Sequence, residues 1–316
     1  MESRLHVVVR DNSSSRLISL TQQGITHLCF CASKKELQVK IRSGKCRHVV
    51  VGMALFVVLA SSPGTVAAKQ VERSPSFRVS SGFLPQRDGF SFANWASNPQ
   101  RGTGVQLLIQ LFGRASICTN VSTNDPCIPL KSAEQFAAQV EDQLATGRCE
   151  GLTVLAAKIH AEGGTPASLV TAQDVSTNID YWWATQMLPS VAAKSRLSRS
   201  LKPSQLINEI RRGVVRGATS TLGMYFQNEG HSVLPISIEK RGNKVVVGVY
   251  DSNTPEITQT LRIDTKTQVW VYSPVDKTGK TLFTWRHKGA GALDVIPLAL
   301  RTPQETRYFS LSSITE

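Results

Sequence analysis

The chain has 316 residues, of which 41% are hydrophobic and 19% are charged. This composition excludes general disorder, and the length allows a hydrophobic core that needs no stabilising metal or disulfide. The formal net charge is +13, but no basic run interleaved with aromatic residues points to nucleic acid as a partner. No CxxC or HxxxH spacing occurs, so we expect neither a structural zinc site nor a cofactor.

The N-terminal quarter has the pattern of a secretory signal peptide. An uncharged apolar run covers residues 49–60, after a cluster of basic residues between Arg42 and Arg47. Small residues ending at Ala68 follow and resemble a cleavage site. Because the run is short for a membrane span, we interpret residues 41–68 as a signal peptide rather than as an anchor. The sequence thus predicts a secreted or extracytoplasmic protein, cleaved near Ala68, with no stable membrane span afterwards.

About 40 residues precede this signal, which is unusual for an export signal. We hypothesise that residues 1–40 are a non-native extension and that translation starts near Val39, where a GTG codon would serve as initiator. N-terminal sequencing of a precursor that begins at Met1 would contradict this. We expect a linker over 69–87 and one domain over 88–316. Residues 69–316 keep 27 Lys and Arg against 20 Asp and Glu, a net charge of about +7. That balance suits acidic cell-surface polymers, or is an ordinary solvated surface.

Three cysteines remain after the signal. Cys118 and Cys127 flank a polar, turn-rich segment, and we expect them to close a small disulfide loop. Cys149 is then the odd cysteine of the exported part. In an exported protein an odd count indicates either a reactive thiol or an intermolecular bridge.

Apolar residues recur at helical spacing in the first half of this domain. Ser132 is the expected N-cap of one helix, and Gly147 and Gly163 are expected to end two of them. The predicted helices span 105–112, 132–146, 149–160, 180–187 and 203–215.

After Gly230 the pattern changes to short, β-branched runs typical of strands. Gly242 and Asn243 form a hairpin turn signal between the first two. Helices followed by an antiparallel sheet give an α+β fold class. The predicted strands span 232–239, 244–250, 257–263, 268–272 and 282–285.

Cys149 begins one of the predicted helices. There its sulfur meets unpaired N–H groups and the positive end of the helix dipole, which stabilise a thiolate. A nucleophilic cysteine also needs a histidine nearby. His160 lies roughly 16 Å along the same helix, which is too far. His287 stands in a polar, turn-like context, so His231, at the start of a strand, is the best candidate.

The strand after His231 returns through the hairpin and ends at Asp251 and Asn253, either of which would orient the imidazole ring. A two-residue turn places 231 opposite 254, which favours Asn253. A bulge, for instance at Gly248, would bring Asp251 into place instead. The sequence leaves both open.

This order of residues resembles that of papain-like cysteine peptidases. A cysteine stands at a helix start, a histidine follows at a strand start, and Asp or Asn follows at the end of the next strand. The local motifs are similar to those of a family of uncharacterised, exported bacterial papain-like proteins. The matching stretches are DGFSFANW, LFGRASIC, GRCEGLTVLA, GHSVLPISI, VYDSNTP and GALDVIP. That family more often has Gly-His-Cys-x-Gly-Met at the nucleophile, whereas here Arg148 and Leu152 replace the His and the Met.

The resemblance implies a papain-like α+β fold with Cys149 as nucleophile, His231 as base and Asp251 as orienting residue. It also implies Gln143 as an oxyanion-hole residue, and Asn94 is a second candidate. Gln143 lies inside a predicted helix, however, so an exposed helical glutamine is the plainer interpretation. For Asn94 the plainer interpretation is a turn cap.

The function expected from these residues is hydrolysis of an amide or peptide bond by a secreted cysteine hydrolase, with a peptide or a cell-wall component as substrate. One alternative is acyl transfer, either transglutaminase-like or by a peptidoglycan amidase. Another is a non-catalytic surface-binding protein on a peptidase scaffold, because fold and function can part.

Overall fold

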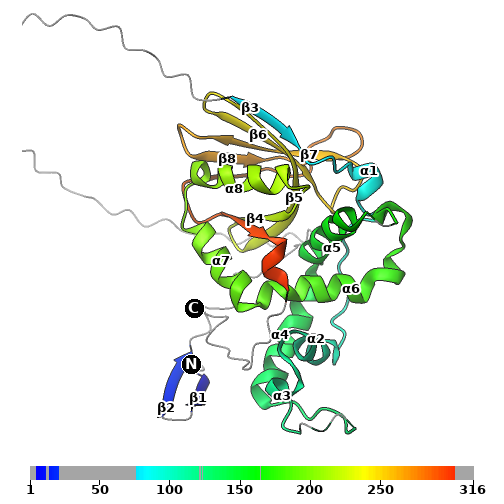
Figure 1. Cartoon of the computed structure of the whole chain (residues 1–316), viewed down its shortest axis with the longest axis vertical. Coiled ribbons are helices and arrows are strands. Elements are labelled where there is room, and N and C mark those ends of the chain that lie inside the picture. Colours follow the sequence, from blue (N-terminus) through cyan, green and yellow to red (C-terminus); the bar gives the residue numbers. More distant parts are fainter. Residues whose placement is uncertain are drawn as a thin grey trace, which may run out of the picture.

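The computed structural model describes residues 5–11, 14–20, 76–120, 122, 124–163 and 165–302. Helices make up most of the part before residue 216, and an antiparallel sheet makes up most of the part after it (Figure 1). The predicted α+β class is therefore confirmed. The predicted signal peptide, 41–68, lies outside the described residues, as does most of the predicted extension, in which β1 (Leu5–Asp11) and β2 (Ser14–Leu20) pair as a hairpin.

The helices agree closely with the apolar pattern. The short turns α1, α3 and η2–η4 join or follow the longer helices. The bounds are α1 Pro85–Asp88, α2 Thr103–Phe112, α3 Arg114–Ile117, α4 Lys131–Thr146, α5 Cys149–Glu162, η2 Ala167–Leu169, α6 Ala172–Ala184, η3 Thr185–Met187, α7 Pro189–Arg199, α8 Pro203–Val215 and η4 Leu298–Arg301.

Two details of the helix predictions are wrong, and helix α7 was not predicted. Ser132 does not cap α4, because the helix begins at Lys131 and the N-cap position is Leu130. The helix predicted from residue 180 begins earlier, at Ala172, where Thr171 and Asp174 form a capping box. Gly163 ends α5 as expected, in the left-handed conformation that glycine adopts at little cost.

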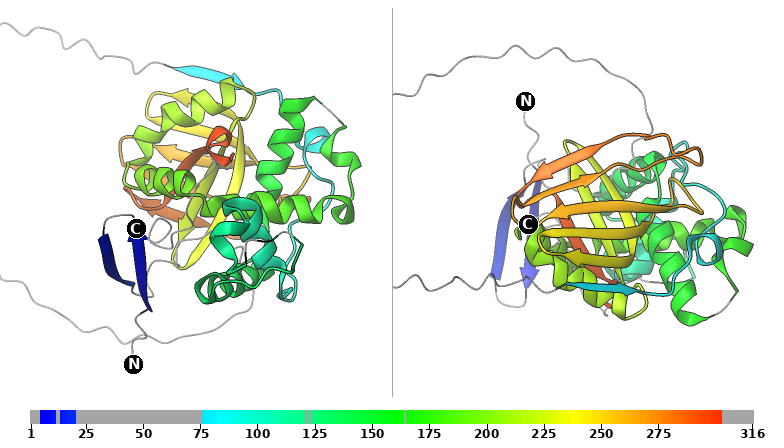
Figure 2. Two further views of the ribbon diagram at one scale, coloured as in Figure 1. Left: turned by 60° about the horizontal axis from the view of Figure 1, so that its bottom comes forward. Right: turned by 90° about the horizontal axis from the view of Figure 1, so that it is seen from above.

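The sheet has the strand order β10-β4-β5-β6-β7-β8-β9, with β3 paired to β5. It curls, so that β9 approaches β4 (Figure 2). The bounds are β3 Phe77–Ser80, β4 Ser220–Phe226, β5 Glu229–Arg241, β6 Lys244–Tyr250, β7 Thr258–Asp264, β8 Val269–Tyr272, β9 Trp285–Lys288 and β10 Leu293–Pro297. The last predicted strand is displaced by three residues, and β3, β4 and β10 were not predicted.

Strand β5 lies between two hydrophobic clusters and so joins the two halves of the fold. On one face of the sheet, α8 packs through Leu206 and Ile210 onto apolar side chains that include Val233. On the other face, α5 packs through Leu152 onto Leu234. The packing of α5 on this face holds the start of the helix against the start of β5.

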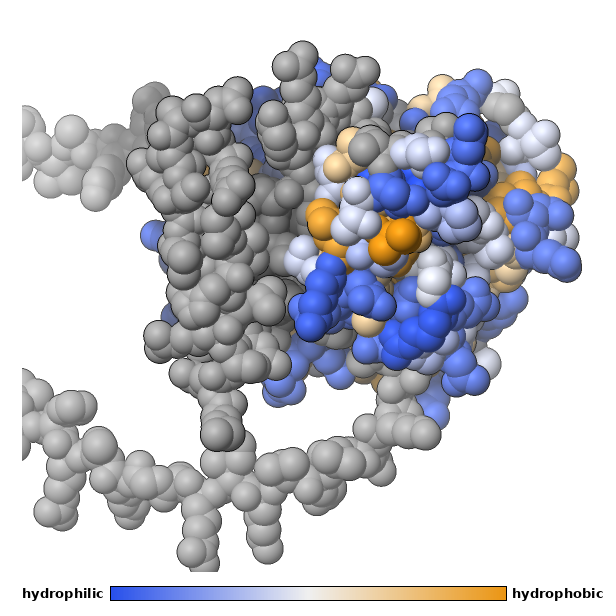
Figure 3. All heavy atoms as spheres, turned by 90° about the horizontal axis from the view of Figure 1, so that it is seen from below, coloured by the Kyte–Doolittle hydropathy of each residue, from blue (hydrophilic) through white to orange (hydrophobic). Residues whose placement is uncertain are grey.

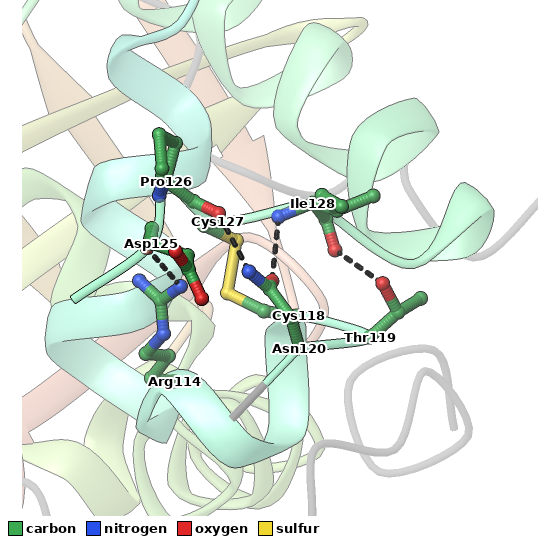
Figure 4. The surroundings of a disulfide bond; sticks show 8 residues. All are labelled: Arg114, Cys118, Thr119, Asn120, Asp125, Pro126, Cys127 and Ile128. Atoms are coloured by element: carbon green, nitrogen blue, oxygen red, sulfur yellow. Dashed lines mark hydrogen bonds between the residues drawn. A yellow bond between two sulfur atoms is a disulfide. The ribbon is translucent and has the colours of Figure 1, made fainter. Parts of the chain in front are cut away.

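The predicted disulfide between Cys118 and Cys127 is present, with an S–S distance of 2.06 Å (Figure 4). Asn120 stabilises the loop by donating to the Pro126 carbonyl at 2.7 Å and accepting from the Ile128 N–H at 2.8 Å. The bridge therefore closes a compact loop after α3.

In the coloured part of Figure 3, hydrophilic side chains predominate, and hydrophobic ones form small separate groups. Within the described part of the chain, no helix combines the length and the apolarity needed to cross a membrane.

Candidate functional site

Cys149 is the first residue of α5, and its side chain is fully buried. It packs against Tyr225 of β4. One turn further along α5, Thr153 donates a hydrogen bond to the Ser232 carbonyl of β5 at 3.2 Å. The start of α5 therefore lies against strands β4 and β5 where these carry Tyr225 and His231.

His231 and Asp251 form a buried pair. The Nε2 of His231 lies 2.8 Å from Oδ1 of Asp251, and the two residues are 2% and 0% exposed. Tyr272 of β8 donates its hydroxyl to the other carboxylate oxygen. The N–H of Asn253 donates to Oδ1 at 2.8 Å, whereas its side-chain nitrogen lies 3.5 Å from the histidine. Asp251, rather than Asn253, therefore orients the ring.

A β-bulge produces this arrangement. The hairpin begins with Arg241 opposite Lys244, but the register shifts between Pro235 and Ser237, so that Leu234 lies opposite Tyr250. Continued along the strands, this register places 231 opposite 253 and puts 231, 251 and 253 on one face of the sheet. Without the bulge, Asp251 would face the other side. The bulge lies opposite Gly248, as considered from sequence, but the extra residue is Ile236 on β5.

Electrostatics keep Asp251 ionised. Burial alone raises the pKa of this carboxyl group. The positive charge and hydrogen bond of His231, with the hydrogen bonds from Tyr272 and Asn253, outweigh burial and hold the pKa of Asp251 below its usual value. Burial beside Asp251 raises the pKa of Tyr272 well above its usual value, so this hydroxyl remains a donor.

Asn94 connects the histidine–carboxylate pair to the start of α5. Its Oδ1 accepts from the N–H of Arg148 at 2.7 Å, and its Nδ2 donates to Oδ1 of Asn253 at 2.9 Å. Its own N–H donates to the Ser252 carbonyl at 2.8 Å. Both ends of the amide are therefore engaged, which supports a bridging role over that of an oxyanion donor.

Arg148 points toward the helical half of the molecule. Its Nε lies 2.6 Å from Asp180 of α6, its Nη1 donates to the Leu144 carbonyl at 3.2 Å, and its guanidinium lies over the Trp95 ring. Burial raises the pKa of Asp180, against the opposing effect of Arg148. The pocket that borders Arg148 contains neither Cys149 nor His231 among its lining residues. Arg148 thus anchors the turn before Cys149.

The remaining residues considered from sequence lie as follows. Gln143 is buried in the last turn of α4 rather than exposed, and its Oε1 has no hydrogen-bond partner among the described residues. His160 lies at the other end of α5, with Nδ1 3.4 Å from Asp88. His287 is on β9, with Nε2 3.0 Å from the Ala290 carbonyl. Neither histidine is part of the His231 pair.

A second polar network lies under the first turn of α5 and was not predicted. Arg301 of η4 is fully buried and pairs with Glu150, the residue after Cys149. Nearby, Asp294 of β10 accepts from the Tyr225 hydroxyl at 2.8 Å and from the Gly223 N–H at 3.0 Å. Burial, together with the negative charge of Glu150, raises the pKa of Asp294 above its usual value. Only the motif GALDVIP, which contains Asp294, marked this region in the sequence.

No His, Cys, Asp and Glu cluster suited to a metal ion occurs among the residues that the structure describes. Comparison of the chain with protein-family models, with curated proteins and with solved structures found no match in any of the three.

Proposed function

We propose that the protein is an exported, papain-like cysteine hydrolase that cleaves an amide or peptide bond through Cys149, His231 and Asp251. The observation that carries the proposal is the buried pair of His231 and Asp251, 2.8 Å apart and tied through Asn253 and Asn94 to the residue before Cys149. Burying charged groups costs free energy even when they are paired, and buried groups with shifted pKa values occur most often at functional sites, which supports a chemical role for this pair.

In the proposed reaction, the Cys149 thiolate attacks the substrate carbonyl carbon. The N–H groups of the first turn of α5, which have no acceptor within the helix, stabilise the oxyanion, and the amide of Gln143 is a second donor. His231 binds Asp251 through Nε2, so Nδ1 exchanges the proton. The protonated His231 gives this proton to the leaving amine as the C–N bond breaks. Water then attacks the thioester, returns a proton through His231, and releases the acid and the thiol.

The reaction requires Cys149 in its reduced form, because the thiolate is the nucleophile. Cys149 and His231 are buried, so the site must open for a substrate. A useful test therefore compares the rates of one variant at two pH values, because the frequency with which the site opens enters both rates and cancels in their ratio.

The test measures alkylation of Cys149 by iodoacetamide in the reduced full-length protein, followed by mass spectrometry of its peptide. We expect the rate at pH 6 to stay within about tenfold of the rate at pH 9, because His231 stabilises the thiolate. In His231→Ala the rate at pH 6 should fall about 200-fold relative to pH 9, as for an ordinary thiol with a pKa of about 8.5.

His287→Ala is the matched control and should behave as the wild type. Identical pH ratios in the wild type and His231→Ala would contradict the proposal. If the pair is present, products formed from labelled casein peptides with and without an added amine separate hydrolysis from acyl transfer. Cys149→Ala should abolish both.

A further inference from the structure

We propose that Arg301 is a positioning residue: by clamping Glu150 to strand β4, it sets the place of Cys149 relative to His231. This inference rests on the function proposed above and adds a residue from the C-terminal part of the chain to the site.

The contacts of Arg301 join three elements. Its Nη2 pairs with Glu150 on α5 and donates to Oγ1 of Thr221 on β4 at 2.9 Å. Its Nη1 donates to Oγ1 of Thr185, at the start of η3, at 3.2 Å. The guanidinium fork fixes direction as well as distance, which a lysine does not.

Position in the chain gives these contacts their significance. Glu150 directly follows Cys149, so fixing its carboxylate fixes the rotation of the first turn of α5. Thr221 lies on β4, where Met224 is paired with His231 of β5. One guanidinium therefore connects the strand pair that carries the histidine with the helix that carries the cysteine. Asn94 makes the corresponding connection on the side of Asp251.

Stability alone is a weak reason for this arrangement. Arg301 is 0% exposed and Glu150 is 5% exposed, and apolar side chains of similar volume often replace such buried pairs without loss of stability. Alignment of a nucleophile has a stricter requirement, because a misplacement of about 1 Å costs about 100-fold in rate.

The clamp is tested in the reduced full-length protein by the same ratio, which is the rate of Cys149 alkylation at pH 6 divided by the rate at pH 9. We expect Arg301→Met to lower the ratio about tenfold and Arg301→Lys to lower it less. Loss of Arg301 also leaves the charge of Glu150 uncompensated beside Cys149 and Asp294. The double variant Arg301→Met with Glu150→Gln removes that charge and should keep the low ratio, because the clamp is still absent.

Two control variants separate position from stability. Arg262→Met makes the same change on an exposed residue of β7. Ile263→Ala removes a core side chain far from His231. Ile263 is paired with Val245 of β6, which is paired with Lys240, at the end of β5 away from His231. Both should keep the wild-type ratio, even where Ile263→Ala lowers the melting temperature as much as Arg301→Met does.

A wild-type ratio in Arg301→Met would overturn the clamp, as would recovery in the double variant or an equal fall in Ile263→Ala. If the wild type and His231→Ala do not differ, the proposed function fails instead. The two failures are therefore distinct.

Discussion

At the scale of single residues, His231 depends on neighbours that are far from it in sequence. Asp251 orients the ring, Tyr272 and the Asn253 N–H hold Asp251, and Asn94 links this group to the turn before Cys149. Together these contacts fix one ring in one orientation. Substitutions here should therefore change reactivity more than they change stability.

Asp251→Asn should lower stability at neutral pH more than at acid pH. The pKa of Asp251 is below its usual value in the folded protein, so its carboxylate contributes stability above the unfolded pKa of about 3.9. That contribution is lost as the pH falls through the lowered folded pKa. We expect a difference from the wild type of about 2–4 kcal/mol at pH 7 that shrinks by pH 3, measured by urea unfolding. A difference independent of pH would contradict an ionised Asp251.

Asn94→Ala should reduce the pH 6 to pH 9 alkylation ratio of Cys149 by about tenfold, because the bridge to Arg148 and Asn253 is lost. Its cost in unfolding free energy should be only about 1–2 kcal/mol. Asn98→Ala, an exposed asparagine four residues away, is the control. Equal ratios in the two variants would show that the bridge does not position the site.

Part of the candidate site was accessible from sequence, because Cys149, His231 and Asp251 stand at the ends of predictable elements. One bulged residue puts both Asp251 and Asn253 on the face of His231, and only the side-chain distances in the folded chain favour Asp251 over Asn253. Pro235 was the available signal, since proline inside a strand is common at bulges. Tyr272 and Arg301 act through side chains that only the folded chain brings near, and no local pattern marks them.

At the scale of elements, α5 is held closely against α6. A Cβ on Gly151 would clash with the Ile179 carbonyl and lie 3.0 Å from the Trp183 nitrogen. The glycine in GRCEGL is therefore explained by helix packing rather than by chemistry.

Gly151→Ala should accordingly cost about 1–3 kcal/mol, and Gly151→Val should cost more, because α5 must move away from α6. Thermal unfolding monitored by circular dichroism measures this order. An alanine variant as stable as the wild type would mean that the two helices separate easily.

The elements that sequence reasoning missed have identifiable physical causes. Helix α7 carries few apolar residues, and only Val191 and Ser198 are buried on it, so its periodicity is weak. Strand β4 contains Gly223, whose missing side chain makes room for Asp294. The long helices and the β5–β6 hairpin were predictable because their apolar faces are continuous.

At the scale of the whole molecule, the Cys118–Cys127 disulfide links the redox state to stability. Reduction should lower stability by opening this loop. For a loop of this length the chain-entropy estimate is about 2–3 kcal/mol.

Titration of the protein with dithiothreitol should therefore lower the melting temperature. In the double variant Cys118→Ser with Cys127→Ser, the melting temperature should already be lower before reduction, and dithiothreitol should not lower it further. A melting temperature that still falls with dithiothreitol in this variant would show that the loop disulfide is not the cause.

The pairing of β10 with β4 also affects when, during synthesis, Cys149 and His231 can become aligned. Synthesis proceeds from the N-terminus, so Cys149 and His231 leave the ribosome well before Leu293–Pro297 and Arg301. Until those residues arrive, β4 is an open edge and the first turn of α5 has no guanidinium beneath it. A growing or truncated chain that stops before Leu293 would therefore carry Cys149 and His231 without the contacts that are proposed to align them.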